Sequence, residues 1–175
     1  MSAPRTLVLA WGNPGRGDDG LGPAFADLLG AYAGFGLTVD SGYQLQVEDA
    51  AEIARHDRVL FVDADRAGEG PFRFQRLAPA AGVPSFTTHS VAPGELLGLA
   101  RSLFGAEPEA WLLGIRGYHF DEFVEELSAP ARANLAAAAG FVREAIRDGV
   151  FLESPAPQTE LVGCGALSAR EVDHV

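Results

Sequence analysis

The chain has 175 residues, a length that fits one domain able to bury a core without disulfides or a structural metal. Its 24 acidic and 13 basic side chains give a net charge of -11, which argues against nucleic acid or an anionic membrane as the main partner. The lone cysteine, Cys164, can form no internal disulfide and fits a reducing compartment, so we expect a cytoplasmic protein. No apolar run approaches the ~20 residues that a membrane-spanning helix needs.

Apolar runs alternate with helical patterns along the chain. Strands are expected at residues 6–11, 37–40, 58–63, 72–77 and 110–115. The run at 6–11 is apolar throughout, as in a strand of a parallel sheet that is buried on both faces, whereas 72–77 alternates like an edge strand that can run antiparallel. Apolar stripes predict helices over residues 21–32, 47–57, 96–104 and 128–146, the last with Ser128 as N-cap and Pro130 in its first turn.

This alternation predicts an α/β fold, a three-layer sandwich in which a mainly parallel, twisted sheet of about five strands carries helices on both faces. We expect residues 1–153 to form a single α/β catalytic domain. Residues 154–175 are rich in Pro, Gly and Ser, a composition typical of a tail without fixed structure.

A glycine-rich stretch at residues 11–23 joins the first predicted strand to the first predicted helix. Its glycines and Asn13 allow turns that other residues resist. Asp18 and Asp19 stand where this turn feeds the helix. One acidic residue is explained by the favourable electrostatics of a helix N-terminus, and we assign that role, or the orientation of the loop, to Asp18. The second carboxylate needs another explanation.

Three residues are expected to meet at the carboxyl edge of the sheet, where open α/β sheets bind ligands. Asp19 follows the first strand, Asp63 ends the third, and His89 precedes the third helix. Each alone has an ordinary explanation, since Asp63, like Asp65 beside it, can cap a strand end and His89 can be a hydrogen-bonded loop histidine. Together, two carboxylates and an imidazole can hold a divalent first-row metal with positions left open.

Other glycine-loop functions fit less well. A P-loop needs Gly-Lys followed by Ser or Thr, but Gly17 precedes Asp18 and Asp19. Asp40 stands about where a dinucleotide-binding fold has its ribose ligand, yet the glycine spacing is not G-x-G-x-x-G, and the two carboxylates would repel a pyrophosphate. No G-x-S-x-G elbow is present, and Cys164 has no evident partner for nucleophilic catalysis.

These motifs resemble the hydrogenase maturation endopeptidases, which trim the C-terminal extension from the large subunit of nickel-iron hydrogenases. The similarity covers roughly residues 7–148, and its most specific part is Gly12-Asn13-Pro14 followed by residues 16–22. In the family the second acidic residue of this stretch, here Asp19, is the first metal ligand. Val62-Asp63-Ala64 and Thr88-His89-Ser90 are similar to the segments that supply the other two ligands.

The resemblance implies a protease that recognises nickel already inserted in its substrate, through Asp19, Asp63 and His89. The expected partner is a nickel-iron hydrogenase large-subunit precursor, with no nucleic acid and no membrane involved. Two chemical steps stay open. In one the ion polarises the peptide carbonyl or a water. In the other the ion only positions the substrate, and Asp18 or Asp19 acts as general base.

Two alternatives stay open at this point. Gly12-Asn13-Pro14-Gly15 also resembles peptidyl-tRNA hydrolase, although the net charge is wrong for an RNA partner. The same carboxylates and imidazole would equally serve a non-catalytic nickel-binding maturation chaperone. Of the remaining histidines, His119 follows the last strand and could contact the substrate, while His56 and His174 are expected to be solvated.

Overall fold

The computed structural model describes residues 4–34, 36–81, 91–121 and 123–154. His89, His174, Cys164 and the tail from residue 155 onward lie outside the described residues. The elements follow in chain order as β1 (Thr6–Trp11), the short 3-10 helix η1 (Gly17–Gly20), α1 (Leu21–Gly30), β2 (Leu37–Gly42), α2 (Asp49–Ile53), β3 (Arg58–Asp65), β4 (Phe72–Leu77), α3 (Pro93–Phe104), β5 (Glu109–Arg116) and α4 (Ala129–Asp148). Within the described ranges, no helix is long and apolar enough to cross a membrane.

The five strands form one sheet in the order β2-β1-β3-β5-β4, which confirms the predicted α/β class and the mainly parallel sheet. β1, β2, β3 and β5 run parallel, and β4 pairs antiparallel with β5 as the edge strand that its alternating sequence predicted. From β1 the chain passes to β2 on one side and then to β3 on the other. The strand order therefore reverses between β1 and β3, where α/β sheets form a crevice at their carboxyl edge.

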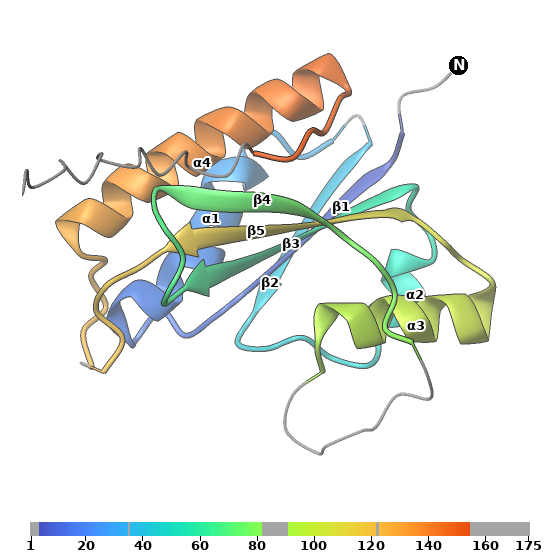
Figure 1. The fold of residues 1–175 in the computed structure, drawn as a ribbon, viewed down its shortest axis with the longest axis horizontal. Helices are drawn as coiled ribbons and strands as arrows, with labels where there is room; N and C mark the ends of the chain where they lie inside the picture. Colours follow the sequence, from blue (N-terminus) through green and yellow to red (C-terminus); the bar gives the residue numbers. More distant parts are fainter. Residues whose placement is uncertain (1–3, 35, 82–90, 122, 155–175) are drawn as a thin grey trace, which may run out of the picture.

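Helices cover both faces of the sheet, as Figure 1 shows. α1 and α4 lie on one face over an apolar cluster that includes Val8, Phe25 and Leu60, and α2 and α3 lie on the other over a cluster that includes Leu7 and Phe61. Neighbouring residues of β1 thus point to opposite faces, and both faces are buried. This double burial explains why the strand is apolar at nearly every position.

Several helix ends differ from the predicted ones. Ser128 caps α4 as expected, with its side chain accepting a hydrogen bond from the Ala131 amide at 3.3 Å. α1 ends at Gly30, so Tyr32 is 54% exposed although the apolar stripe extends to it. α3 ends at Phe104 as predicted but begins at Pro93, before the predicted start at residue 96, and the Phe104 ring is exposed.

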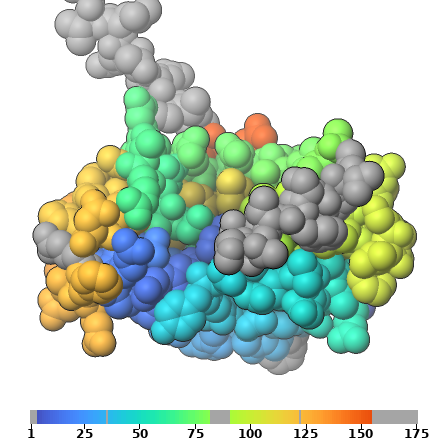
Figure 2. Space-filling view, turned by 90° about the horizontal axis from the view of Figure 1, so that it is seen from below, coloured from blue at the N-terminus to red at the C-terminus, as the bar shows by residue number. Residues whose placement is uncertain are grey.

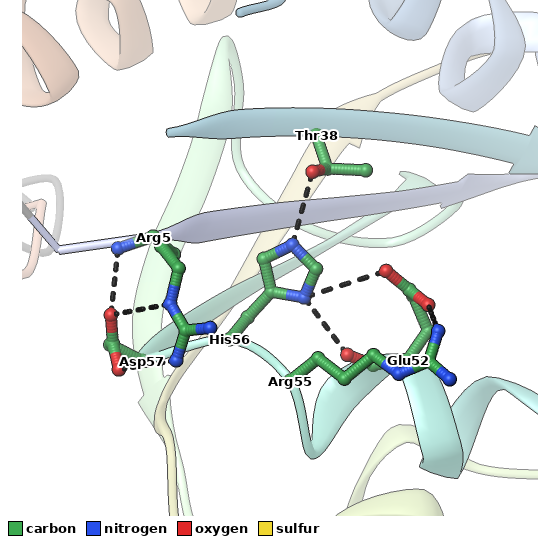
Figure 3. A network of polar contacts seen from close by, with 6 residues as sticks. All are labelled: Arg5, Thr38, Glu52, Arg55, His56 and Asp57. Atoms are coloured by element: carbon green, nitrogen blue, oxygen red, sulfur yellow. Dashed lines mark hydrogen bonds and ion pairs between the residues drawn. The ribbon is translucent and has the colours of Figure 1, made fainter. Parts of the chain in front are cut away.

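The predicted solvation of His56 is wrong. α2 ends at Ile53, before the predicted limit, and the chain folds His56 back so that its side chain is only 8% exposed. Its Nδ1 lies 2.9 Å from the Glu52 carbonyl oxygen and its Nε2 3.0 Å from the Thr38 hydroxyl (Figure 3). Beside it Arg5 and Asp57 form an ion pair at 3.2 Å. These contacts join β1, β2 and α2 at the amino edge of the sheet, away from the predicted site.

Candidate functional site

The loop between β1 and α1 is folded so tightly that glycine is required in it. Gly12 has φ +142°, and a Cβ built on it would lie 2.0 Å from the Asp19 carbonyl oxygen. Gly17 has φ +58°, and its Cβ would lie 2.7 Å from the His119 carbonyl oxygen. The glycines therefore let the loop close on itself and on the segment after β5, which fixes where Asp18 and Asp19 stand.

Asp18 is completely buried and serves as a structural anchor. Its carboxylate accepts four hydrogen bonds, from the amides of Tyr118 (2.8 Å), His119 (3.0 Å) and Ser128 (2.7 Å) and from the Ser128 hydroxyl (2.8 Å). Burial alone would raise its pKa, but these donors outweigh that effect and hold the pKa below its ordinary value. These contacts suit Asp18 to position the loop and leave it poorly suited to accept a proton.

Asp65, at the end of β3, is also occupied by structural contacts. It accepts hydrogen bonds from the amides of Ala67 (3.0 Å) and Gly68 (2.8 Å) and from Arg73 (2.7 Å). Burial again opposes its charge, but these partners prevail and lower its pKa. Asp65 therefore closes the turn between β3 and β4.

Asp19 and Asp63 flank the point between β1 and β3 where the strand order reverses, and fewer donors meet them than meet Asp18 or Asp65. Asp19 accepts a hydrogen bond from the Asn13 amide at 3.0 Å, and Asp63 accepts one from the Ala64 amide at 2.8 Å. Asp63 is partly buried, and this burial, together with the negative charges of Asp19 and Asp65, raises its pKa to about 6. The charge of Asp19 thus acts on Asp63 at the switch point of the sheet, the place between β1 and β3 where the strand order reverses. A cation bound there would relieve the repulsion between the two carboxylates.

The third predicted ligand, His89, lies outside the described residues. Among the residues that are described, no three His, Cys, Asp or Glu side chains come together as a metal site. The ligand set of Asp19, Asp63 and His89 therefore stays a prediction. His119 has an exposed side chain, and its backbone is bonded to Asp18.

Two hollows in the described surface differ in their relation to these carboxylates. A crevice of about 130 Å³ lies at the carboxyl ends of β1 and β2, lined among others by Trp11, Asp40 and Asp49. A larger one of about 780 Å³ lies at the opposite edge, beside Thr6 and Arg58, the first residues of their strands. The larger hollow lies at the edge opposite to the predicted site. The crevice borders Trp11 at the carboxyl edge, but neither Asp19 nor Asp63 lines it.

Sequence reasoning missed two contributors to the site. Trp11 packs edge-on against Phe61, with ring centroids 6.3 Å apart, and its side chain interacts with the Asp63 carboxylate. Ser128 was expected as a helix cap but not as a double donor to Asp18. A tryptophan at the carboxyl end of a central strand was the available signal for the first, and no local pattern indicated the second.

Comparisons with known proteins were made for sequence and for structure. The chain matches no protein-family profile and no curated protein sequence. Solved structures do match it. The hydrogenase maturating endopeptidase HybD from E. coli superimposes with a TM-score of 0.65 at 22% identity, over 82% of this chain and 93% of that one. The chain has the fold of the hydrogenase maturation endopeptidases.

Two further hydrogenase maturation proteases superimpose equally broadly. HycI from Thermococcus kodakarensis gives a TM-score of 0.63 at 22% identity, over 83% of this chain and 95% of that one. The hydrogenase 2 maturation peptidase from a Thaumarchaeota archaeon gives 0.60 at 26% identity, over 81% and 97%. The family resemblance that the motifs indicated is confirmed, and the shared fold spans nearly the whole of each maturation endopeptidase.

Replacing Gly12 by alanine is expected to destabilise the maturation-endopeptidase fold by about 2–4 kcal/mol, because the new methyl group meets backbone and the φ angle is strained. The matched control is Gly140→Ala in α4, where a Cβ has nothing within 4 Å. That change should be neutral or should stabilise the helix by up to about 1 kcal/mol. Urea denaturation of both variants measures the difference, and equal stabilities would contradict the packing described for Gly12.

Asp18→Asn is expected to cost about 2–4 kcal/mol at pH 7, because an amide cannot accept from all of these buried donors. The pKa of Asp18 is lowered in the folded chain, so its stabilisation is present above the ordinary carboxyl pKa and is lost as the pH falls below it. Thermal unfolding between pH 3 and 8 should show the deficit narrowing below pH 4. The control Asp27→Asn, on the exposed side of α1, should unfold like the wild type at every pH.

Asp63→Asn is expected to stabilise the protein at neutral pH. The folded chain holds the Asp63 proton up to about pH 6, so the charged form costs on the order of 3 kcal/mol above that pH and nothing below pH 3.8. Asp65→Asn, two residues away, should instead destabilise, because its pKa is lowered and it loses the contact with Arg73. Melting temperatures at pH 7.5 and 3.5 distinguish the two variants. A loss of stability in both at pH 7.5 would contradict the opposite effects that we assign to the charges of Asp63 and Asp65.

Proposed function

We propose that this chain is an endopeptidase that removes the C-terminal extension of a nickel-iron hydrogenase large-subunit precursor after nickel insertion. Two observations support the proposal. The fold is that of proteins described as hydrogenase maturation proteases. The second, on which the proposal chiefly depends, is the pair Asp19 and Asp63, which stands at the switch point of the sheet and is met by few donors.

Nickel recognition by Asp19, Asp63 and His89 is the specific form of this proposal. Burial first, and then the negative charges of Asp19 and Asp65, raise the pKa of Asp63 to about 6, so the charged form of Asp63 is unfavourable where no cation binds. A divalent cation brought by the substrate would neutralise both carboxylates. Two carboxylates and one imidazole also leave coordination positions for ligands from the precursor, so that the ion can be shared rather than extracted.

The hydrolytic step needs a water activated near the ion. In one version the substrate-borne ion polarises the peptide carbonyl or the water. In the other a carboxylate takes the proton of the water as it adds to the carbonyl carbon, and the proton passes to the leaving nitrogen as the C–N bond breaks. Of the acidic residues proposed for this role, Asp18 is the least suited because all its hydrogen bonds are already used by backbone and Ser128. Its proposed part is to hold Asp19 in place.

The test is mass spectrometry of a hydrogenase large-subunit precursor, with and without nickel, after incubation with this protein. The wild type should shorten the nickel-loaded precursor by its C-terminal extension and leave the nickel-free one intact. Asp19→Asn, Asp63→Asn and His89→Ala should each slow processing by about 100-fold or more, because each removes a ligand. Asp27→Asn is the control for an acidic residue of the same region and should process at the wild-type rate.

Two outcomes would overturn parts of the proposal. Full activity of Asp19→Asn would remove metal recognition by that residue. A stable complex with the nickel-loaded precursor that never releases the extension would show a nickel-binding chaperone rather than a protease.

A further inference from the structure

The segment between β5 and α4 presents an aromatic side chain to solvent. Phe123 is 91% exposed, more than any other large apolar side chain in the described part of the chain. Its neighbours are held by hydrogen bonds: the Val124 carbonyl accepts from the Gly17 amide at 2.7 Å, and the His119 carbonyl accepts from the Asp18 amide at 2.8 Å. The backbone on both sides of Phe123 is therefore anchored to the loop that carries Asp18 and Asp19.

The same segment is strongly acidic. Residues 118–127 contain Asp121, Glu122, Glu125 and Glu126 and no lysine or arginine. The Asp121 side chain is 92% exposed, and its nearest cation is Arg66, at 4.0 Å. Glu125 and Glu126 are exposed and make no ion pair within the described residues. An exposed aromatic ring among carboxylates is complementary to a chain segment that carries both apolar and basic side chains.

This surface continues directly into the candidate site. Gly17 and Asp18, which hold the segment, immediately precede Asp19 in η1. In Figure 2 the orange surface that includes the segment borders the blue surface of the loop after β1. A substrate bound over Asp19 would therefore pass beside Phe123.

We propose that residues 118–121 and 123–126 form the docking surface for a basic, apolar segment of the hydrogenase precursor, with Phe123 as its anchor. The inference rests on the proposed function and adds to it the contact that selects the substrate. A second copy of this chain is the wrong occupant, because two such acidic surfaces on chains of net charge -11 would repel each other. Aromatic residues in such positions commonly carry most of the binding energy of an interface.

Phe123→Ala tests the anchor. With a nickel-loaded precursor from the same organism, we expect KM to rise at least about tenfold while kcat stays within about twofold, because the residue binds substrate but does not touch the reacting atoms. Phe104→Ala is the matched control: this ring is also exposed, at the end of α3 where the chain approaches the amino end of β5, and its removal should change neither constant. An unchanged KM in Phe123→Ala would overturn the inference.

Charge reversal tests the complementarity. Glu125→Lys with Glu126→Lys should raise KM further and remove much of its dependence on salt concentration, whereas a neutral partner segment would leave both unchanged. Asp27→Lys with Glu144→Lys, at exposed positions of α1 and α4, makes the same change in net charge and is the control.

A photoreactive phenylalanine analogue at position 123 separates this inference from the proposed function. Crosslinking to the nickel-loaded precursor without cleavage would retain the docking surface and reject the protease. Cleavage without crosslinking would reject the docking surface and retain the protease. If neither crosslinking nor cleavage occurs, both the docking surface and the protease function are rejected.

Discussion

The buried carboxylate of Asp18 is the interaction on which the arrangement of the site depends. It joins the loop after β1 to Tyr118 and His119 after β5 and to Ser128 at the start of α4. These three partners lie 100 to 110 positions after Asp18 in the sequence. A charged group can be buried in this way only because its oxygens are met by donors on every side. The same contacts place the next residue, Asp19, at the carboxyl edge of the sheet beside Asp63.

The acidic residues at this edge divide into two kinds. Asp18 and Asp65 have lowered pKa values because donors surround them, and they stabilise the fold. Asp63 has a raised pKa, and the charge of Asp19 contributes to it. Asp19 and Asp63 accept hydrogen bonds from the Asn13 and Ala64 amides, but among the described residues no cation pairs with either, and the raised pKa of Asp63 means that its charge opposes folding. Such a cost is typical of residues retained for binding or catalysis, and it supports a cation as the ligand.

Much of the fold could be predicted from the sequence, because strands buried on both faces are apolar at nearly every position. β1 and β4 match their predicted limits, and β3 and β5 extend only slightly beyond theirs. Helix ends were less predictable: α2 stops early because His56 turns back to contact Glu52 and Thr38, and those partners cannot be inferred from spacing.

Of the candidate site, the sequence indicated the edge at which Asp19 and Asp63 lie, whereas His89 lies outside the described residues and its part stays a prediction. The position of Asp19 and Asp63 follows from strand ends meeting at one edge of a parallel sheet. The difference between Asp18 and Asp19, or between Asp63 and Asp65, depends on donors supplied from elsewhere in the chain, such as Ser128 and Arg73. The sequence already favoured a positioning role for Asp18 over Asp19, but only the fold shows the donors that hold Asp18 in place.

The central claim is that Asp19 and Asp63 lie close enough at one edge of the sheet for the charge of Asp19 to raise the pKa of Asp63. Carbon-13 NMR titration of the side-chain carboxylates, in the wild type and in Asp19→Asn, measures this directly. The account predicts a pKa of about 6 for Asp63 in the wild type and a lower value once the charge of Asp19 is removed. An Asp63 that titrates identically in both proteins would contradict it.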